Sequence, residues 1–279
     1  ELGPVPPDGT PSDARNGWVV DAYLAFGLGD DVPDLTFMWL TDPDHTAHGK
    51  GIGAPESVAS LRMVDGQLGR LFAALRERGL AETTDIIVTS DHGFSTHTGG
   101  FSVGSLLREN GFEAVTAGGA IYLADKDDAA RVVKLLQATP GYGSIFTAPK
   151  SPGSIEGRIA GTLSFDAIHW NHERAADILV SPDWTDEEGV PGFRGTTTAG
   201  GVAGHGSDSY FDIRATLIAG GPSFKAGLRS DVPTSNVDIA PTVCAILGIA
   251  PAKTMQGRKV AAACGGGAAP EEVAIENRF

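Results

Sequence analysis

Two apolar runs that each end abruptly in aspartate and histidine constrain the fold of this chain more than any other feature. The first run, Leu35–Leu40, passes directly into "TDPDHTAHG", and the second, Asp85–Thr89, passes directly into "SDHGFS". Short runs of this kind are typical of strands buried on both faces of a parallel sheet. Because the carboxyl ends of parallel strands share one edge, where ligands bind in open α/β folds, the two polar segments are expected to meet there.

The segment between the two runs predicts a long amphipathic helix from about Pro55 to Arg78. Apolar residues recur in it at steps of three and four, which places them on one helical face. These residues are Val58, Leu61, Val64, Leu68, Leu71 and Leu75. Gly79 then provides a helix stop, and the resulting strand–helix–strand order implies a parallel sheet.

The middle of the chain differs from the two ends. Residues 101–200 mix short strand-like and helix-like stretches with Gly/Pro-rich segments, whereas the core pattern resumes with "IRATLIAGGPSF" and "NVDIAPTVCAILGI". We therefore expect an α/β fold in which residues 1–100 and 201–262 form one discontinuous metal-binding core. Residues 101–200 are expected to form an inserted α+β cap, and residues 263–279 a tail.

Composition limits the kinds of partner. Apolar residues make up 41% of the chain, enough for a substantial core, and the formal net charge is −14. So acidic a chain is a poor match for a nucleic-acid duplex, which calls for a clustered basic face. An anionic substrate would need a local cation to hold it, and a metal ion supplies the largest local charge. No apolar stretch reaches the roughly 18 residues of a membrane span.

Five residues carry ligand-type side chains at predicted loop positions: Asp44, His48, Asp91, His92 and His205. Carboxylate oxygens and neutral imidazoles suit Zn²⁺, or less often Mn²⁺ or Fe. Each pattern is weak when taken alone. The Asp44/His48 pair also fits a helix cap with a solvated histidine, and His205 also fits a flexible glycine loop. Together they favour a two-metal site.

Three further residues invite a functional interpretation. His45 adjoins Asp44 and is expected to face solvent or to support a ligand. His97 fits an exposed loop histidine better than a residue lining the site. Trp170 has cationic neighbours and would suit stacking on a nucleobase, but a packing role is favoured.

Four stretches resemble the type I phosphodiesterase/nucleotide pyrophosphatase branch of the alkaline phosphatase superfamily. They are "PDLTFMWLTDPDHTAHGKG", "DIIVTSDHGFS", "GHGS" and "SNVDIAPTVCAILGI". The resemblance implies an alkaline-phosphatase-like, mostly parallel sheet with helices on both faces. It also implies two zinc ions per complete active site. Asp44, His48 and His205 match the ligands of one zinc, and Asp91 and His92 match two ligands of the other.

The chain departs from the family at its amino-terminal side. Members carry a further metal-binding Asp and a Thr or Ser nucleophile well upstream of the D-x-x-x-H loop, but only 43 residues precede Asp44 here. Thr10 and Ser12 are rejected as nucleophiles because neither a strand before them nor a helix directly after them is expected. The nucleophile is therefore expected upstream of Glu1.

Several expectations follow for the chain as a whole. It is expected to lack the first strands of the sheet, to be a fragment that starts in a loop, and to be nearly inactive alone. Whether Glu1 is a natural start is open.

The resemblance implies zinc-dependent hydrolysis of phosphate esters, and phosphodiester or nucleotide pyrophosphate bonds are the preferred prediction for the bond that is cleaved. The expected partner is a small phosphorylated substrate such as a nucleotide. The family resemblance implies a periplasmic or secreted protein, and the oligomeric state is open. The alternatives are a sulfatase, a relative of the cofactor-independent phosphoglycerate mutases, and a metal-binding relic without catalysis.

Overall fold

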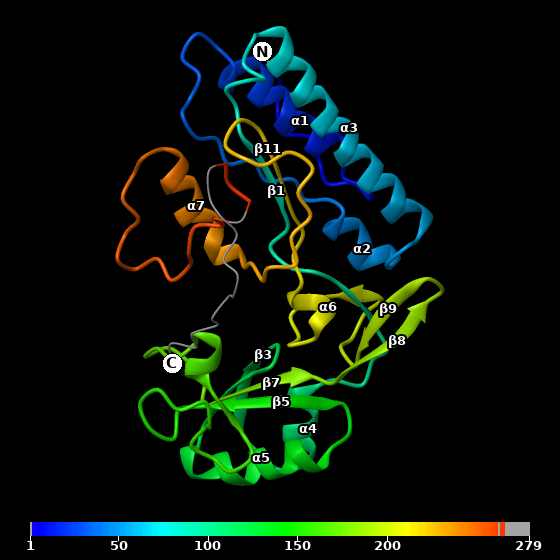
Figure 1. The fold of residues 1–279 in the computed structure, drawn as a ribbon. Helices are drawn as coiled ribbons and strands as arrows, with labels where there is room; N and C mark the ends of the chain where they lie inside the picture. Colours follow the sequence, from blue (N-terminus) through cyan, green and yellow to red (C-terminus); the bar gives the residue numbers. More distant parts are fainter. Residues whose placement is uncertain (1, 262, 266–279) are drawn as a thin grey trace. The chain divides into compact units, whose positions relative to one another are not determined.

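The computed structural model describes residues 2–261 and 263–265, which fall into two compact units (Figure 1). The first unit contains the described residues within 1–46, 55–93 and 214–275, and the second contains those within 47–54 and 94–213. The division crosses a single short helix, α2 (Asp44–Lys50), between Thr46 and Ala47.

The first unit combines helices with a two-stranded sheet. Its helices are α1 (Asp13–Ala22), the π-helical turn η1 (Tyr23–Gly27), α3 (Pro55–Glu77), the 3₁₀ turn η4 (Asn236–Asp238) and α7 (Ile239–Ile246). Its strands are β1 (Ile86–Thr89) and β11 (Leu217–Gly220), which pair antiparallel with Ile86 opposite Gly220.

Helix α3 confirms the predicted helix to within one residue. It lies beside α1 in Figure 1, and Arg70 of α3 donates to Asp21 of α1 at 2.5 Å. Its predicted apolar face is only partly covered, because Leu75 is buried while Leu61 is exposed. The apolar period thus fixes the extent of the helix but not how much of its face is buried.

The first predicted strand is not a strand in the structure. Residues 35–40 form no regular element, no described strand pairs with them, and Phe37 is 81% exposed. An apolar run becomes a strand only where a neighbouring strand pairs with its backbone N–H and C=O groups. The parallel order expected around β1 is also wrong, since its partner β11 runs antiparallel.

The second unit contains two sheets. Its strands are β2 (Ser95–His97), β3 (Ala114–Ala117), β4 (Ala120–Leu123), β5 (Tyr142–Thr147), β6 (Leu163–Ser164), β7 (Ile178–Pro182), β8 (Trp184–Val190), β9 (Phe193–Thr197) and β10 (Ala203–Gly204). One sheet has the order β10-β2-β9-β8 and the other β3-β4-β7-β5-β6. Parallel pairing among the described strands occurs in β2–β9 and β5–β6, so the sheets are mixed rather than mostly parallel.

Short helices accompany these sheets. They are α4 (Val103–Glu109), η2 (Lys126–Asp128), α5 (Ala129–Ala138), η3 (Phe165–Ile168) and α6 (Tyr210–Ile213). The core of this unit joins α5 to the five-stranded sheet, with Val132 and Leu136 packed among Ile121, Ile145 and Ile178. The short strand-like and helix-like stretches predicted within residues 101–200 are thereby confirmed in type.

The glycine-rich segment "GFRGTTTAGGVAGHGSDS" contributes β9 and β10. Its glycines hide the strand pattern, but pairing with β2 supplies the hydrogen bonds. Both cysteines are free thiols. No described helix is long and apolar enough to cross a membrane.

Two predictions about the ends of the chain stay untested. The division into a metal-binding core and a cap remains a prediction, and residues 266–279 of the predicted tail lie outside the described residues. The expectation of a nucleophile upstream of Glu1 also stays a prediction.

Candidate metal centre

Helix α2 carries two of the predicted ligands. Asp44 and His48 stand four residues apart on it, so their side chains project from neighbouring turns of the same face. The helix is kept short by its sequence, since Gly49 and Gly51 follow His48 and Gly51 adopts a positive φ of 94°. The Asp44–His48 relation therefore follows from a single turn of helix.

A buried carboxylate holds the start of α2. Asp42 is 4% exposed, and its Oδ1 accepts hydrogen bonds from the backbone N–H and the hydroxyl of Thr46. Its Oδ2 accepts from the Ser12 backbone N–H and the Asn16 side-chain amide. With four donors, this carboxylate is fully hydrogen-bonded, and it ties the first turn of α2 to the first turn of α1.

The ring of His48 is oriented from the other side. Its Nδ1 lies 3.1 Å from the carbonyl oxygen of Ala203, just before His205. A carbonyl can only accept, so Nδ1 carries the proton and Nε2 keeps its lone pair for a ligand. The rings of His48 and His205 lie 5.1 Å apart, and Phe94 packs against both, at 5.0 and 5.7 Å between centroids.

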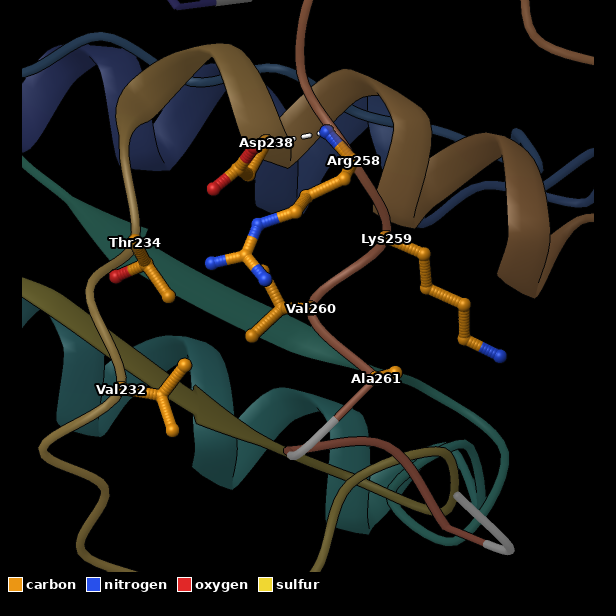
Figure 2. Close-up of a pocket in the computed structure, with 7 residues that line it drawn as sticks. All are labelled: Val232, Thr234, Asp238, Arg258, Lys259, Val260 and Ala261. Atoms are coloured by element: carbon orange, nitrogen blue, oxygen red, sulfur yellow. Dashed lines mark hydrogen bonds between the residues drawn. The ribbon is translucent and has the colours of Figure 1, made fainter. Parts of the chain in front are cut away.

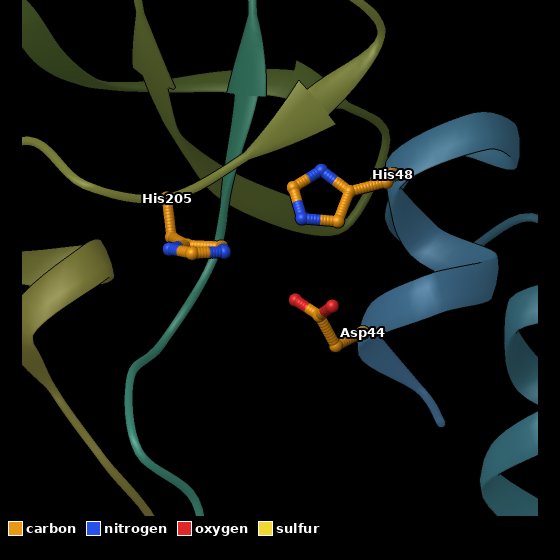
Figure 3. A group of neighbouring side chains, drawn as sticks. All are labelled: Asp44, His48 and His205. Carbon is orange, nitrogen blue, oxygen red and sulfur yellow. The ribbon is translucent and has the colours of Figure 1, made fainter. Parts of the chain in front are cut away.

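Figure 3 draws the three predicted ligands of the first zinc, of which His48 and His205 lie in the second unit and Asp44 stands one helical turn before His48. Each offers one ligand atom, a carboxylate oxygen or an imidazole nitrogen. One carboxylate oxygen and two imidazole nitrogens form a donor set that fits Zn²⁺, with room for a water or substrate as fourth ligand. The Ala203 carbonyl acts as the outer partner that metal-bound histidines usually have.

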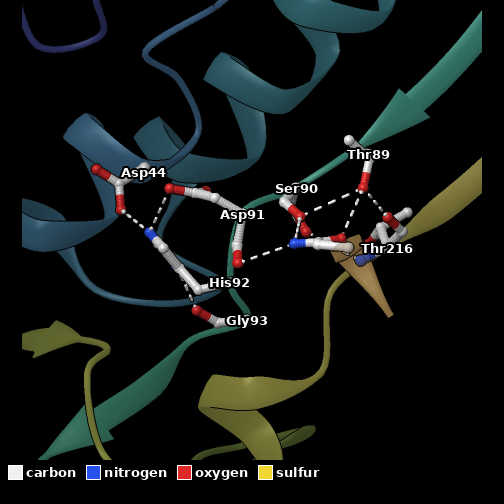
Figure 4. Close-up of polar contacts among 8 residues, drawn as sticks. Asp44, Thr89, Ser90, Asp91, His92, Gly93 and Thr216 are labelled. Atoms are coloured by element: carbon white, nitrogen blue, oxygen red, sulfur yellow. Dashed lines mark hydrogen bonds and ion pairs between the residues drawn. The ribbon is translucent and has the colours of Figure 1, made fainter. Parts of the chain in front are cut away.

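Asp91 and His92 follow β1 at its carboxyl end, as the sequence predicts. His92 Nε2 lies 3.4 Å from Asp91 Oδ2 and 3.6 Å from Asp44 Oδ1 (Figure 4). The Nδ1 atom of His92 lies 2.8 Å from the Gly93 carbonyl oxygen, which again leaves Nε2 as the ligand atom. Asp44 thus lies close to His92 within the first unit.

The other predicted residues have simpler environments. His45 is exposed. His97 is not the expected exposed loop histidine, because it is half-buried at the end of β2, where its Nδ1 donates to the Gly200 carbonyl at 2.8 Å. Trp170 packs edge-on against the buried Phe165, with ring centroids 5.2 Å apart and an interplanar angle of 88°. This contact agrees with the packing interpretation of Trp170.

The region of Thr10 and Ser12 requires a correction. A helix does follow Ser12 directly, because α1 begins at Asp13 and Ser12 occupies its N-cap position. The expected absence of a helix there is therefore wrong, and it gives no reason to reject these residues. Ser12 is nevertheless 2% exposed, so its hydroxyl is shielded from any substrate in this structure.

Sequence reasoning missed three residues that shape the centre: Asp42, Phe94 and Ala203. Asp42 and Phe94 each stand within two residues of a predicted ligand, which was the only available signal. Ala203 acts through its backbone carbonyl, a role that cannot be predicted from the type of residue.

Comparison with known proteins places these features in context. Residues 8–186 match the family described as type I phosphodiesterase / nucleotide pyrophosphatase. The human ectonucleotide pyrophosphatase/phosphodiesterase family member 7 is 27% identical over 244 residues, covering 83% of this chain and 49% of that protein. A mouse bis(5'-adenosyl)-triphosphatase is 22% identical, covering 80% of this chain and 46% of its own length. The chain thus spans about half the length of the curated relatives it matches.

Solved structures share the fold. An inactive variant of murine ectonucleotide pyrophosphatase/phosphodiesterase 5, in complex with AMP, superposes with a TM-score of 0.62 at 20% identity, covering 83% of this chain and 58% of that one. A mutant of the alkaline phosphatase PafA gives a TM-score of 0.71 at 17% identity, covering 91% and 53%. The predicted α/β, alkaline-phosphatase-like fold class is confirmed.

Proposed function

Because this chain belongs to the type I phosphodiesterase/nucleotide pyrophosphatase family, we propose that it forms the metal-binding part of a hydrolase of phosphate esters. The proposed bonds are phosphodiester or nucleotide pyrophosphate bonds. The observation that carries the proposal is the family match over residues 8–186, together with the His48 and His205 rings, whose centroids lie 5.1 Å apart within the second unit. Hydrogen bonding of His48 to a backbone carbonyl supports the same conclusion, because it prepares the ring for a ligand.

We propose zinc as the metal, held by Asp44, His48 and His205 at one site and by Asp91 and His92 at a second. Bound zinc would stabilise the negative charge that develops on the phosphoryl and leaving oxygens. The protein's part is to present the Asp44 carboxylate beside His92 and to hold the His48 and His92 imidazoles each in a single tautomer. A local cation also offsets the repulsion between an anionic substrate and a chain of net charge −14.

The attacking hydroxyl is proposed to come from a residue other than Thr10 or Ser12, upstream of Glu1. Ser12 is buried, and its backbone N–H is committed to Asp42. A covalent phospho-enzyme, formed when a hydroxyl displaces the leaving group and later hydrolysed by water, is the reaction course that the family resemblance implies. The 279-residue chain by itself is accordingly proposed to turn over very slowly.

A nucleotide is the proposed substrate class. Support comes from the similar structure that holds AMP and from the relative named for bis(5'-adenosyl) triphosphate hydrolysis. Several relatives are named ectonucleotide enzymes, which supports a periplasmic or extracellular location. The residues 101–200, as the proposed cap, would select the leaving group.

The decisive experiment measures zinc and nucleotide binding before activity. Calorimetric titration of the metal-free chain should show zinc binding, and AMP should then bind the zinc-loaded chain but not the metal-free one. The full-length gene product should hydrolyse bis-p-nitrophenyl phosphate in a zinc-dependent manner and leave p-nitrophenyl sulfate intact. A chain that binds no zinc contradicts the proposal. Zinc binding without turnover by the full-length protein would instead identify a metal-binding relic.

A further inference from the structure

Asn236 connects the segment "SNVDIAPTVCAILGI" to the loop that carries Asp91 and His92. Its side-chain Nδ2 donates to two consecutive carbonyl oxygens, those of Ser90 at 2.9 Å and Asp91 at 3.1 Å. Its Oδ1 lies 3.3 Å from the hydroxyl oxygen of Thr89. The Asn236–Asp91 contact joins residues 145 positions apart in the sequence, and both lie in the first unit.

Asn236 is itself held in place by a cap of hydrogen bonds. It opens the turn η4, where Ser235 and Asp238 form a reciprocal capping box. The Asp238 carboxylate is buried, and its Oδ1 accepts from the backbone N–H of Arg258 at 2.8 Å (Figure 2). The hydroxyl of Thr242 donates to the Asp238 carbonyl at 2.7 Å. The amide of Asn236 therefore projects from a fixed turn.

The strand side of the same loop has its own anchors. The backbone N–H of Thr216, just before β11, donates to the Ser90 hydroxyl at 2.9 Å. The Thr89 hydroxyl in turn donates to the Thr216 carbonyl at 2.9 Å (Figure 4). These bonds fix the chain up to Ser90. Among the hydrogen bonds described for the next residue, Asp91, the bond from the Asn236 amide is the one that connects its backbone to a residue outside the loop.

We propose that Asn236 is a positioning residue, which sets the backbone from which Asp91 and His92 reach a metal ion. This role rests on the proposed function, since it concerns the second of the two metal groups. An amide nitrogen suits the task because it carries two N–H groups, one for each carbonyl. No other uncharged side chain of this size offers two donors and one acceptor at once.

The test is a cobalt titration of the full chain, in which visible absorption reports the coordination of each Co²⁺ equivalent. His205→Ala and His92→Ala identify which absorption change belongs to which group. In Asn236→Ala, Co²⁺ affinity at the His92 group should fall roughly 10-fold or more, as is usual for lost outer partners of metal ligands. Affinity at the His205 group should stay within about 2-fold of wild type, which also shows that the variant is folded.

Two further variants sharpen the result. Asn236→Asp keeps the shape and the acceptor of the side chain but loses both N–H donors, so it should also lower the Co²⁺ affinity of the His92 group. An added negative charge alone would instead raise the affinity for a cation. Asn110→Ala is the matched control, because Asn110 likewise donates its amide to a carbonyl, that of Leu106, but in the other unit. It should leave both affinities unchanged.

The outcomes distinguish failure of the positioning role from failure of the proposed function. Wild-type chain that binds no Co²⁺ overturns the proposed function and the role of Asn236 with it. Normal binding at both groups in Asn236→Ala and Asn236→Asp overturns the positioning role alone. A lower melting temperature with unchanged affinities also overturns it, since Asn236 would then only stabilise the fold.

Discussion

His48 and Ala203 are joined by a hydrogen bond of 3.1 Å that decides which ring nitrogen of His48 can bind a metal ion. The bond spans 155 positions in sequence, and it links the ligand on α2 to the strand β10 immediately before His205. One backbone carbonyl therefore orients one predicted ligand, His48, and the chain continues from it to another predicted ligand, His205.

Replacing His205 should remove zinc from the first group. His205→Ala leaves Asp44 and His48 as the remaining protein ligands, too few for a tight tetrahedral site. Elemental analysis after dialysis should show about one equivalent less zinc than in wild type. His172→Ala is the control, since His172 is also an exposed histidine but accepts a backbone hydrogen bond from Arg174 elsewhere in the chain. Equal zinc in His205→Ala and wild type contradicts the assignment.

Gly204 should tolerate no side chain. A Cβ there would lie 2.6 Å from His97 Cε1 and 3.1 Å from His48 Cε1, so both rings would have to move. Gly204→Ala should weaken zinc binding and cost about 1–3 kcal/mol of unfolding free energy, as overpacking usually does. Gly200→Ala meets no atom within 4 Å and should leave both properties unchanged. Calorimetry and thermal melting measure the two effects, and a neutral Gly204→Ala would show that the His48 ring is not confined.

Asp42 should be a main support of the first unit. Asp42→Ala leaves the buried donors of Ser12, Asn16 and Thr46 without their acceptor, which should lower the free energy of unfolding by about 2–4 kcal/mol. Asp34→Ala changes an exposed carboxylate and should stay within about 0.5 kcal/mol of wild type. Guanidinium denaturation compares the two. Similar losses in both variants would mean that Asp42 makes no special contribution.

Ser12 should be dispensable for any residual activity. Its hydroxyl is buried and has no hydrogen-bond partner in the structure, so Ser12→Ala should alter neither turnover of bis-p-nitrophenyl phosphate nor the melting temperature by much. The chain alone should be slow, because loss of a nucleophile typically costs on the order of 10⁶ in kcat. Robust turnover that disappears in Ser12→Ala or Thr10→Ala would place the nucleophile in the opening segment, not upstream of Glu1.

Local sequence patterns were enough to predict several helices, strands and candidate ligands. The apolar period of residues 55–78 specified α3, since a helix closes its hydrogen bonds within itself. The run before Ser90 specified β1, and the paired Asp and His residues that follow residues 40 and 89 marked the candidate ligands. Asp44 and His48 required only one turn of helix to come together. In these cases the interactions that determine the structure join residues that are close in sequence.

Tertiary structure decided what depends on distant partners. Residues 35–40 have a strand-like composition, yet no described strand pairs with them, and β1 pairs antiparallel with a strand that lies far along the chain. The glycine-rich segment before His205 became β9 and β10 because β2 supplied hydrogen bonds to it. The carbonyl of Ala203 and the amide of Asn236 contact predicted ligand residues 155 and 145 positions away. A backbone carbonyl is chemically the same at every residue, so only the folded chain determines which one a histidine will meet.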